Sequence, residues 1–356
     1  MKKKKVLVGM SGGVDSSVAA LLLMKQGFEV EGVHMKVGSG GSPGIPACSA
    51  PGERDMEDAR RIASILGIKF SVVDLSREYE EKVIGYFRRE YREGRTPNPC
   101  VVCNRFLKFG ALLEKAVSAG LSFDFHATGH YARIVHEKNG GLHLLMKGKD
   151  PGKEQSYFLF LLGQEHLSRL ILPLGEMFKE DTRKIARENS LPVSEKEESQ
   201  DFASGGKDII LKEGAEEGDI VDAEGCFLGR HRGIIYYTVG QRKGLGVAGG
   251  KPLYVVGIDP EKKRIVLGEK SGLYGKAFNV REVNYISGKL PVMPFRCLVK
   301  VRYRHAAAPA EVIHSEEGKA EVIFDVPQWA ITPGQAAVFY REDLLLGGGF
   351  IEKVLY

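Results

Sequence analysis

The chain has 356 residues, of which 43% are hydrophobic and 27% charged, and its formal net charge is +5. This length predicts more than one folding unit, and the composition is typical of a globular protein and excludes a disordered one. The apolar runs are shorter than the roughly 20 residues of a membrane span, and no secretory signal precedes the first strand, so we expect a cytoplasmic protein that does not act at a membrane.

The stretch from Val6 to Ser17 predicts a phosphate-binding turn. A short apolar strand breaks into Ser11-Gly12-Gly13, and a helical pattern follows at once. Glycines let the backbone approach a ligand, and the N–H groups of the turn and of the helix N-terminus favour an anion. Serine hydroxyls add donors, and we expect Asp15 to hold Mg²⁺ through water or to orient the loop. The chain has no Gly-Lys pair followed by Ser or Thr, which excludes a Walker loop.

Strands and helices alternate up to about residue 130. Strands are predicted at 29–35, 69–75 and 123–128, and helices at 55–66, 77–91 and 106–119. This alternation predicts a parallel sheet covered on both faces. Two long connections interrupt it, one over 37–53 and one over 94–104.

Further elements follow in the second half of the chain. One arm of a hairpin is expected over 142–147, after the turn Asn139-Gly140-Gly141, and helices are expected over 156–170 and 179–189. After Gly206 short strands with Gly or Pro turns dominate, at 234–239, 253–258, 265–267, 296–302, 319–324 and 336–340. We interpret the chain as three domains: a catalytic domain over 1–205, a central β domain over 206–275, and a C-terminal β-barrel over 276–356.

Cys100 and Cys103 form a CxxC pair in the second long connection. A zinc ribbon would need a second such pair, and a thioredoxin motif would follow a strand. Sulfur chemistry or cluster ligation is therefore favoured, and nearby basic residues are expected to favour the nucleophilic thiolate. A structural pair of cysteines in a tight turn is the alternative. The odd total of five cysteines, with Cys48, Cys226 and Cys297, makes a disulfide scaffold improbable.

Basic residues gather in two segments, which suits a polyanionic partner. A solvated charged face is the alternative for each. The first segment holds Arg88, Arg89, Arg92, Arg95, Arg105 and Lys108, and the second holds Lys300, Arg302, Arg304 and His305.

Motifs along nearly the whole chain resemble those of the tRNA-specific 2-thiouridylases, a family of PP-loop ATP pyrophosphatases that replace the C2 oxygen of the wobble uridine with sulfur. The motifs are GMSGGVDSS, MEDARRIASILGI, GRTPNPCVVCNRFLKFG, ATGHYAR, KGKDPGKEQSYFL, TVGQRKGLG, VRYRH and ITPGQ. The resemblance implies an α/β fold, namely a PP-loop parallel sheet of the adenine nucleotide alpha hydrolase type followed by two small β modules, the last a β-barrel. It also implies ATP and Mg²⁺ as cofactors, the anticodon stem-loop of tRNA as partner, and a sulfur-donor protein or a small sulfur source.

The resemblance also assigns roles to single residues. Cys103 would be the nucleophile, with Asp15, Cys100 and Cys48 as further catalytic candidates. ATP would be bound by Gly9, Met10, Ser11, Gly12, Gly13, Val14, Asp15, Ser16, Met35 and Gly129. The target base would be met by Asn98, Pro99 and Cys100, and the rest of the tRNA by His130, Lys153, Glu154, Gln155, Arg302, Tyr303 and Gln335.

One departure from the family pattern concerns sulfur delivery. Many relatives carry a second catalytic cysteine after Ser-Gln-Asp, where this chain has Ala203. We hypothesise that Cys48, Cys100 and Cys103 hold a [4Fe-4S] cluster, because three thiolates leave one iron open to bind the transferred sulfur. The competing account makes Cys103 a simple nucleophile with Cys48 or Cys100 as its disulfide or persulfide partner.

Two other functions compete with tRNA thiolation. One is a PP-loop ligase that adenylates a small molecule or an acid to be aminated, which would need neither the CxxC pair nor the basic segments. The other is a non-catalytic RNA-binding protein that senses ATP, against which the intact Asp15 and Cys103 argue.

Overall fold

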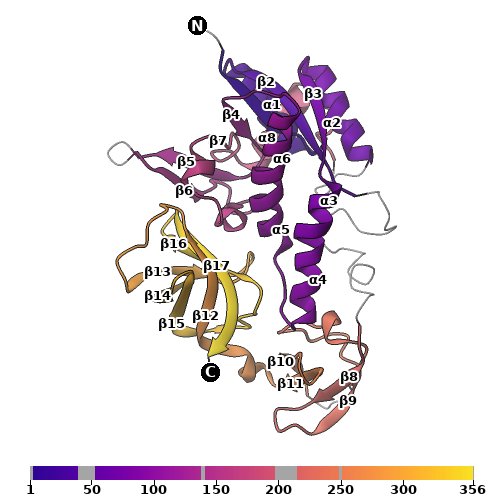
Figure 1. Cartoon of the computed structure of the whole chain (residues 1–356), viewed down its shortest axis with the longest axis vertical. Helices are drawn as coiled ribbons and strands as arrows, with labels where there is room; N and C mark the ends of the chain where they lie inside the picture. The colour runs from indigo at the N-terminus through magenta and orange to yellow at the C-terminus, as the bar shows by residue number, and fades with distance from the viewer. Residues whose placement is uncertain (1–2, 39–52, 138–140, 197–214, 248–250, 356) are drawn as a thin grey trace.

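The computed structural model describes residues 3–38, 53–137, 141–196, 215–247 and 251–355. Figure 1 shows an elongated molecule with the N-terminal sheet at one end, a small sheet at the other, and the C-terminal barrel beside the long helices between them. None of the helices in the described ranges is long and apolar enough to cross a membrane.

A five-stranded parallel sheet forms the N-terminal part. Its order is β3-β2-β1-β4-β7, and the strands are β1 (Lys5–Gly9), β2 (Glu29–Lys36), β3 (Lys69–Asp74), β4 (Phe125–Ala127) and β7 (Leu170–Ile171). All four pairings are parallel. The predicted parallel sheet and its strands at 29–35, 69–75 and 123–128 are therefore confirmed.

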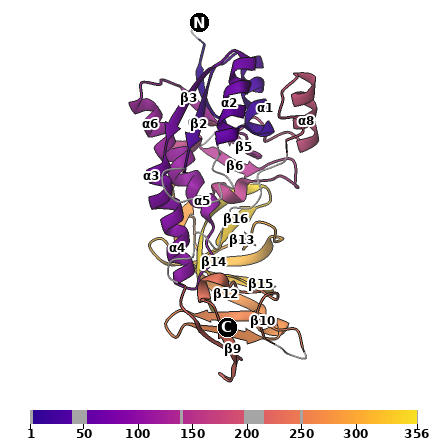
Figure 2. The same cartoon turned by 90° about the vertical axis from the view of Figure 1, so that its right-hand side faces the viewer.

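Alternation along β1 explains why both faces of this sheet are covered. Val6 and Val8 pack into a core with α1 (Val14–Lys25), α2 (Glu53–Leu66) and α8 (Lys179–Glu188). Leu7 faces the other core, which contains the helices that follow β3. Figure 2 shows α6 (Leu112–Ser118) and α8 on opposite sides of the sheet.

Two long helical segments follow β3. The first runs through α3 (Ser76–Tyr79), a π-helical stretch over Glu80–Ile84 and α4 (Gly85–Arg92). The second runs through α5 (Pro99–Val102), a π-helical stretch over Cys103–Ala111 and α6 (Leu112–Ser118). The second helix starts earlier than predicted, because Pro99 occupies its first position, where a missing N–H costs no hydrogen bond. Both cysteines of the CxxC pair therefore lie on a helix and not in the predicted loop.

The segment after β4 departs from the prediction in one place. The hairpin is confirmed, with β5 (Ala132–His136) paired antiparallel to β6 (His143–Lys147), and α8 is found where a helix was expected. The single helix expected over 156–170 is wrong. A short 3₁₀ helix over Ser156–Leu159 and α7 (Gln164–Leu167) occupy this segment instead. Residues 160–163 separate them, and Gly163, whose backbone is extended, is the N-cap of α7.

The central part is a four-stranded sheet in the order β10-β11-β8-β9. Its strands are β8 (Gly218–Val221), β9 (Phe227–His231), β10 (Tyr254–Asp259) and β11 (Arg264–Gly268). The strands expected at 253–258 and 265–267 are confirmed. The strand expected at 234–239 is wrong, since a 3₁₀ turn over Ile234–Tyr236 follows Gly233, whose φ of 133° breaks the extended chain.

The C-terminal part is a closed antiparallel barrel of six strands. They are β12 (Tyr274–Tyr285), β13 (Phe295–Lys300), β14 (Ala308–Glu316), β15 (Lys319–Trp329), β16 (Ala336–Arg341) and β17 (Leu344–Leu355), closed by pairing between β12 and β17. The predicted barrel is confirmed. The β5–β6 hairpin extends the sheet at the start of β17, where Met146 pairs with Leu344.

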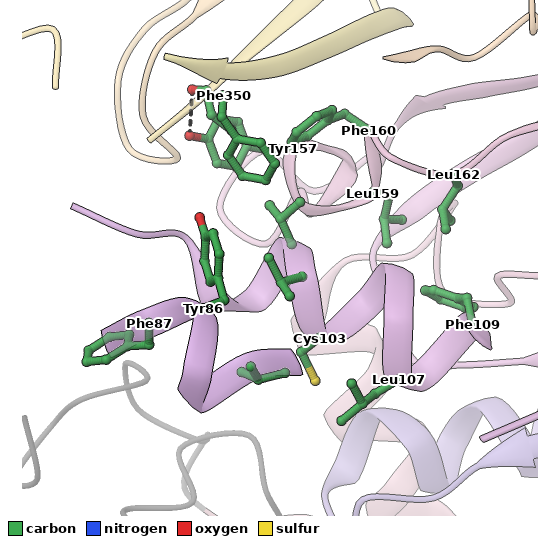
Figure 3. Close-up of a cluster of buried hydrophobic side chains, with 14 of the residues drawn as sticks. Tyr86, Phe87, Cys103, Leu107, Phe109, Tyr157, Leu159, Phe160, Leu162 and Phe350 are labelled. Atoms are coloured by element: carbon green, nitrogen blue, oxygen red, sulfur yellow. Dashed lines mark hydrogen bonds between the residues drawn. The ribbon is translucent and has the colours of Figure 1, made fainter. Parts of the chain in front are cut away.

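The barrel packs directly on the helices that carry the CxxC pair. Figure 3 shows Tyr86 of α4 and Cys103 and Leu107 of the second helical segment in one apolar cluster with Tyr157, Phe160 and Phe350. Phe350 of β17 lies with its ring centroid 5.7 Å from that of Phe160. Because this core is continuous, the barrel helps to fix the position of the cysteine-bearing helix.

Candidate active site

The turn between β1 and α1 has the shape that the sequence predicts for a phosphate site. Gly12 has a φ of +77°, and a Cβ at this position would lie 2.1 Å from the carbonyl oxygen of Asp55, so only glycine fits. The backbone N–H of Ser11 donates to Ser16 Oγ over 3.2 Å, and Ser17 Oγ donates to the Gly13 carbonyl over 2.7 Å. These bonds hold the turn in place ahead of the N-terminus of α1.

A second glycine brings the end of β4 against this turn. A Cβ on Gly129 would lie 2.7 Å from the carbonyl carbon of Asp15 and 2.8 Å from the amide nitrogen of Ser16. Gly129 therefore lies against the first turn of α1, at the carboxyl edge of the sheet where nucleotides bind in such folds.

One cavity of about 920 Å³ joins this turn to the other predicted motifs. Of the residues predicted for the site, it is lined by Gly9, Met10, Ser11, Gly13, Val14, Asp15, Ser16, Met35, Cys100, Cys103, Gly129, His130, Lys153, Glu154, Gln155 and Tyr303. Gly12, Asn98, Pro99, Arg302 and Gln335 do not line it. Cys48 and Ala203 lie outside the described residues.

Asp15 is held by two side chains from later in the chain. Lys179 Nζ lies 2.7 Å from both carboxylate oxygens, and the hydroxyl of Tyr131 donates to Oδ1 over 2.9 Å. Thr182 Oγ1 lies 3.0 Å from the same hydroxyl. Asp15 thus faces the cavity from a fixed position.

Lys196 holds the other side of the turn. Its ammonium donates to the Gly12 carbonyl over 3.1 Å, to Asp55 over 2.7 Å and to Asp58 over 2.5 Å. Burial lowers the pKa of Lys196, but the hydrogen bonds to the two carboxylates outweigh it, so that the pKa is raised overall and the ammonium stays charged.

Cys103 is 4% exposed and lies in the first turn of the π-helical stretch. Burial raises the pKa of its thiol, and Lys108 opposes that shift. The expectation that basic neighbours favour the thiolate is therefore wrong in its net direction. Burial of the thiol is the reason. Among the other predicted cations, Arg88 pairs with Glu80, and Arg95 pairs with Glu90 and Glu93.

The segment before the cysteines is tied to the barrel. The side-chain amide of Gln335 donates to the carbonyls of Thr96 and Pro97 over 3.0 and 3.1 Å, and the Thr96 N–H donates to the Pro333 carbonyl over 2.8 Å. Asn98, next in the chain, is 7% exposed and its N–H donates to Tyr86 Oη. Gln335 thus fixes the residues that lead into the helical segment of Cys100 and Cys103 (residues 99–118, the cysteine helix).

The loop after β13 brings barrel residues to the cavity opposite the phosphate-binding turn. Tyr303 lies with its ring centroid 4.5 Å from that of Phe158, and Lys300 Nζ lies 5.4 Å from the Tyr303 ring. Arg302 points elsewhere: its guanidinium donates to the carbonyls of Val239 and Ala330 and to Thr332. Arg302 is thus a structural tie between the central part and the barrel.

His130 lies on the cavity wall with Nδ1 2.7 Å from Thr128 Oγ1. Burial, aided by the charge of Lys108, lowers the pKa of His130 well below its ordinary value. The imidazole is therefore neutral at pH 7 and offers a hydrogen bond without charge.

Sequence reasoning missed several polar residues of the cavity. Asp55, Lys179 and Lys196 line it without having been assigned a role, and Lys108 and Lys300 were named only as members of the two basic segments. Lys108 follows Cys103 by five residues on one helix, which is a local signal. Lys179 is 164 positions from its partner Asp15, and Lys196 is 184 positions from its partner Gly12. No local pattern in the sequence indicates contacts over such separations.

Comparison with known proteins covers almost the whole chain. Residues 4–203 match the family model of the tRNA methyl transferase HUP domain, residues 208–269 the tRNA methyl transferase PRC-barrel domain, and residues 275–351 the aminomethyltransferase β-barrel domain. These domain names refer to methyl transfer, whereas the full-length relatives are named for thiolation.

Three such relatives are each named tRNA-specific 2-thiouridylase MnmA. That of Carboxydothermus hydrogenoformans is 46% identical over 365 residues, which cover 99% of both chains. That of Acetivibrio thermocellus is 44% identical over 371 residues, covering 99% of this chain and all of the relative. That of Moorella thermoacetica is 46% identical over 360 residues, covering 98% and 99%. At this identity over the full length, the chain belongs to the tRNA-specific 2-thiouridylase family.

Proposed function

We propose that this chain is a tRNA 2-thiouridylase, a sulfurtransferase that activates C2 of the wobble uridine with ATP and replaces its oxygen with sulfur, releasing AMP and pyrophosphate. The observation that carries the proposal is the single cavity in which the phosphate-binding turn, both cysteines of the CxxC pair and the barrel residue Tyr303 meet. A ligase for small molecules has no need of a wall built from the barrel.

The turn after β1 would bind ATP and position it for the adenylation step. The backbone N–H groups of Gly13 and Val14, which line the cavity, would bind the phosphates, and Met35 and Gly129 would border the adenosine. Asp15 is the candidate ligand for Mg²⁺, which would neutralise phosphate charge when bound. The uracil C2 oxygen attacks the α-phosphorus, and pyrophosphate leaves. The oxygen is then part of an adenylate ester, a far better leaving group.

The sulfur half falls to the cysteine helix. The terminal sulfur of a persulfide on Cys103 attacks C2, and AMP leaves with the former C2 oxygen. A partner thiol then attacks the Cys103 sulfur, which frees 2-thiouridine and leaves a disulfide for an external thiol to reduce. Cys100 lines the same cavity and is the proposed partner thiol. The [4Fe-4S] hypothesis needs three thiols; the described residues contain no group of three or more His, Cys, Asp or Glu arranged to hold a metal ion, and Cys48 lies outside them. The [4Fe-4S] cluster therefore stays a hypothesis.

The part of the cavity next to the barrel would bind the tRNA. A wobble base must leave the anticodon stack to reach a cavity, at a cost of roughly a few kcal/mol that contacts to the RNA must offset. Tyr303 and Phe158 offer aromatic faces there, and Lys153, Gln155 and His130 offer donors. We propose the cytoplasm as the place of action, because tRNA is the substrate, and a donor protein or a small sulfur source as the supplier of sulfur.

Nucleoside analysis of tRNA tests the proposed function. After incubation with the protein, ATP, Mg²⁺ and a sulfur source, the tRNA should contain 2-thiouridine, and AMP should be formed in a tRNA-dependent manner. Cys103→Ser should abolish thiolation, whereas Cys226→Ser, at an exposed position in the central part, should not. Formation of ADP as the tRNA-dependent product would contradict the assignment.

Anaerobic reconstitution tests the cluster separately. About four iron per chain, lost when Cys48, Cys100 or Cys103 is replaced by Ala, would support it. Full thiolation by an iron-free preparation would exclude it and leave the account in which Cys103 acts with a disulfide or persulfide partner.

A further inference from the structure

A buried ammonium group faces the phosphate-binding turn from the N-terminus of α8. Lys179 is 8% exposed, lines the cavity, and lies 2.7 Å from both carboxylate oxygens of Asp15. From this placement we propose that Lys179 binds the pyrophosphate portion of ATP, its ammonium shared between Asp15 and a phosphate oxygen. The proposal rests on the proposed function, which makes this turn an ATP site.

The surrounding residues hold both Lys179 and its partner Asp15 in position. The backbone N–H of Lys179 donates to Asp150 Oδ2 over 2.9 Å, which holds the first turn of α8. Nζ lies 5.7 Å from the centre of the Tyr131 ring, while the Tyr131 hydroxyl donates to Asp15. A lysine whose side chain is already ordered loses little rotamer entropy when it binds an anion.

Charge complementarity explains why a cation is needed here. The turn lacks the lysine that a Walker loop places on the phosphates, so positive charge must come from elsewhere in the fold. Asp15 alone would repel a polyphosphate, and Lys179 compensates that charge. Lys196, the other ammonium group at the turn, is engaged by both Asp55 and Asp58 and by the Gly12 carbonyl. Lys179 thus supplies positive charge beside Asp15 at the phosphate-binding turn.

Binding measurements on the full-length protein test this assignment. Isothermal titration with pyrophosphate and, separately, with AMP, both with Mg²⁺ and without tRNA, divides the phosphate contacts from the adenosine contacts. Lys179→Met should weaken pyrophosphate binding about tenfold to a hundredfold, the range for losing one charge-assisted hydrogen bond, and leave AMP binding within about twofold. Lys179→Arg should restore part of the loss. The matched control is Lys184→Met on the same helix, where the side chain is 69% exposed, and it should bind pyrophosphate like the parent.

Lys179→Gln separates charge from structure, because its amide still donates to Asp15 but carries no charge. It should retain the thermal midpoint of the parent and still lose pyrophosphate affinity. Equal pyrophosphate binding by parent and Lys179→Gln overturns the Lys179 assignment alone. A parent protein that binds neither pyrophosphate nor AMP overturns the ATP site and the proposed function with it.

Discussion

Removal of the Glu90 carboxylate should weaken the attachment of α4 to strand β12 of the barrel. Glu90 is 1% exposed and accepts from Arg95 at 2.7 and 2.8 Å and from Arg281 of β12 at 3.1 Å on each oxygen. The hydrogen bonds that Arg95 donates to this carboxylate raise the pKa of Arg95. Glu90→Ala leaves two guanidinium groups, with side chains 23% and 20% exposed, without their shared counter-charge. Loss of one partner of a buried pair costs about 3–5 kcal/mol. Because Arg95 keeps Glu93 and Arg281 keeps Glu282, we expect a loss at the lower end of that range.

The control for this prediction uses the same arginine. Glu93 also pairs with Arg95 but has a side chain that is 46% exposed, so Glu93→Ala should cost at most about 1 kcal/mol. The assay is urea unfolding followed by the fluorescence of Trp329, the single tryptophan, which lies in the barrel. If Glu90→Ala and Glu93→Ala reduce the free energy of unfolding equally, the buried network does not hold the barrel and the reasoning is refuted.

Three further outcomes are expected. Because burial raises the pKa of Cys103 and Lys108 lowers it, alkylation of Cys103, followed by mass spectrometry, should rise with pH to a midpoint above the ordinary cysteine value of about 8.5, and Lys108→Met should move it higher still; a midpoint at or below that value would contradict the geometry. Gly12→Ala should weaken ATP binding more than tenfold, since it adds about 1–2 kcal/mol of left-handed strain to a backbone clash, whereas Gly27→Ala, also at positive φ but with open space around it, should leave ATP affinity unchanged. Arg302→Ala should lower the thermal midpoint and leave the dissociation constant for tRNA unchanged, because Arg302 ties the central part to the barrel. An unchanged midpoint together with weaker tRNA binding would restore Arg302 as an RNA contact.

Local patterns predicted the elements that depend on their own sequence. The apolar run of β1, the two glycines and the following helix specify the phosphate-binding turn, because strand alternation, positive φ and helix polarity are properties of neighbouring residues. One arm of the hairpin, β6, and three of the six barrel strands, β13, β15 and β16, were predicted for the same reason.

Tertiary contacts decided the places where local patterns failed. The apolar spacing over 156–170 imitates a helix, yet Tyr157, Phe160 and Leu162 are buried on the irregular segment that joins the catalytic core to the barrel, as Figure 3 shows. The state of the Cys103 thiol likewise depends on burial, which basic neighbours in sequence do not reveal. Lys179 was missed because its partner Asp15 is 164 positions away.

The bonds from Gln335 to Thr96 and Pro97 have a consequence for how the protein is made. They join positions 239 and 238 apart, so synthesis from the N-terminus completes the phosphate-binding turn long before the cysteine helix receives its last anchor. Such distant pairing is also slow to form once the chain is released. A prematurely terminated chain would carry the turn without a fixed thiol, and the assembly of the reactive centre thus waits for the last strands of the barrel.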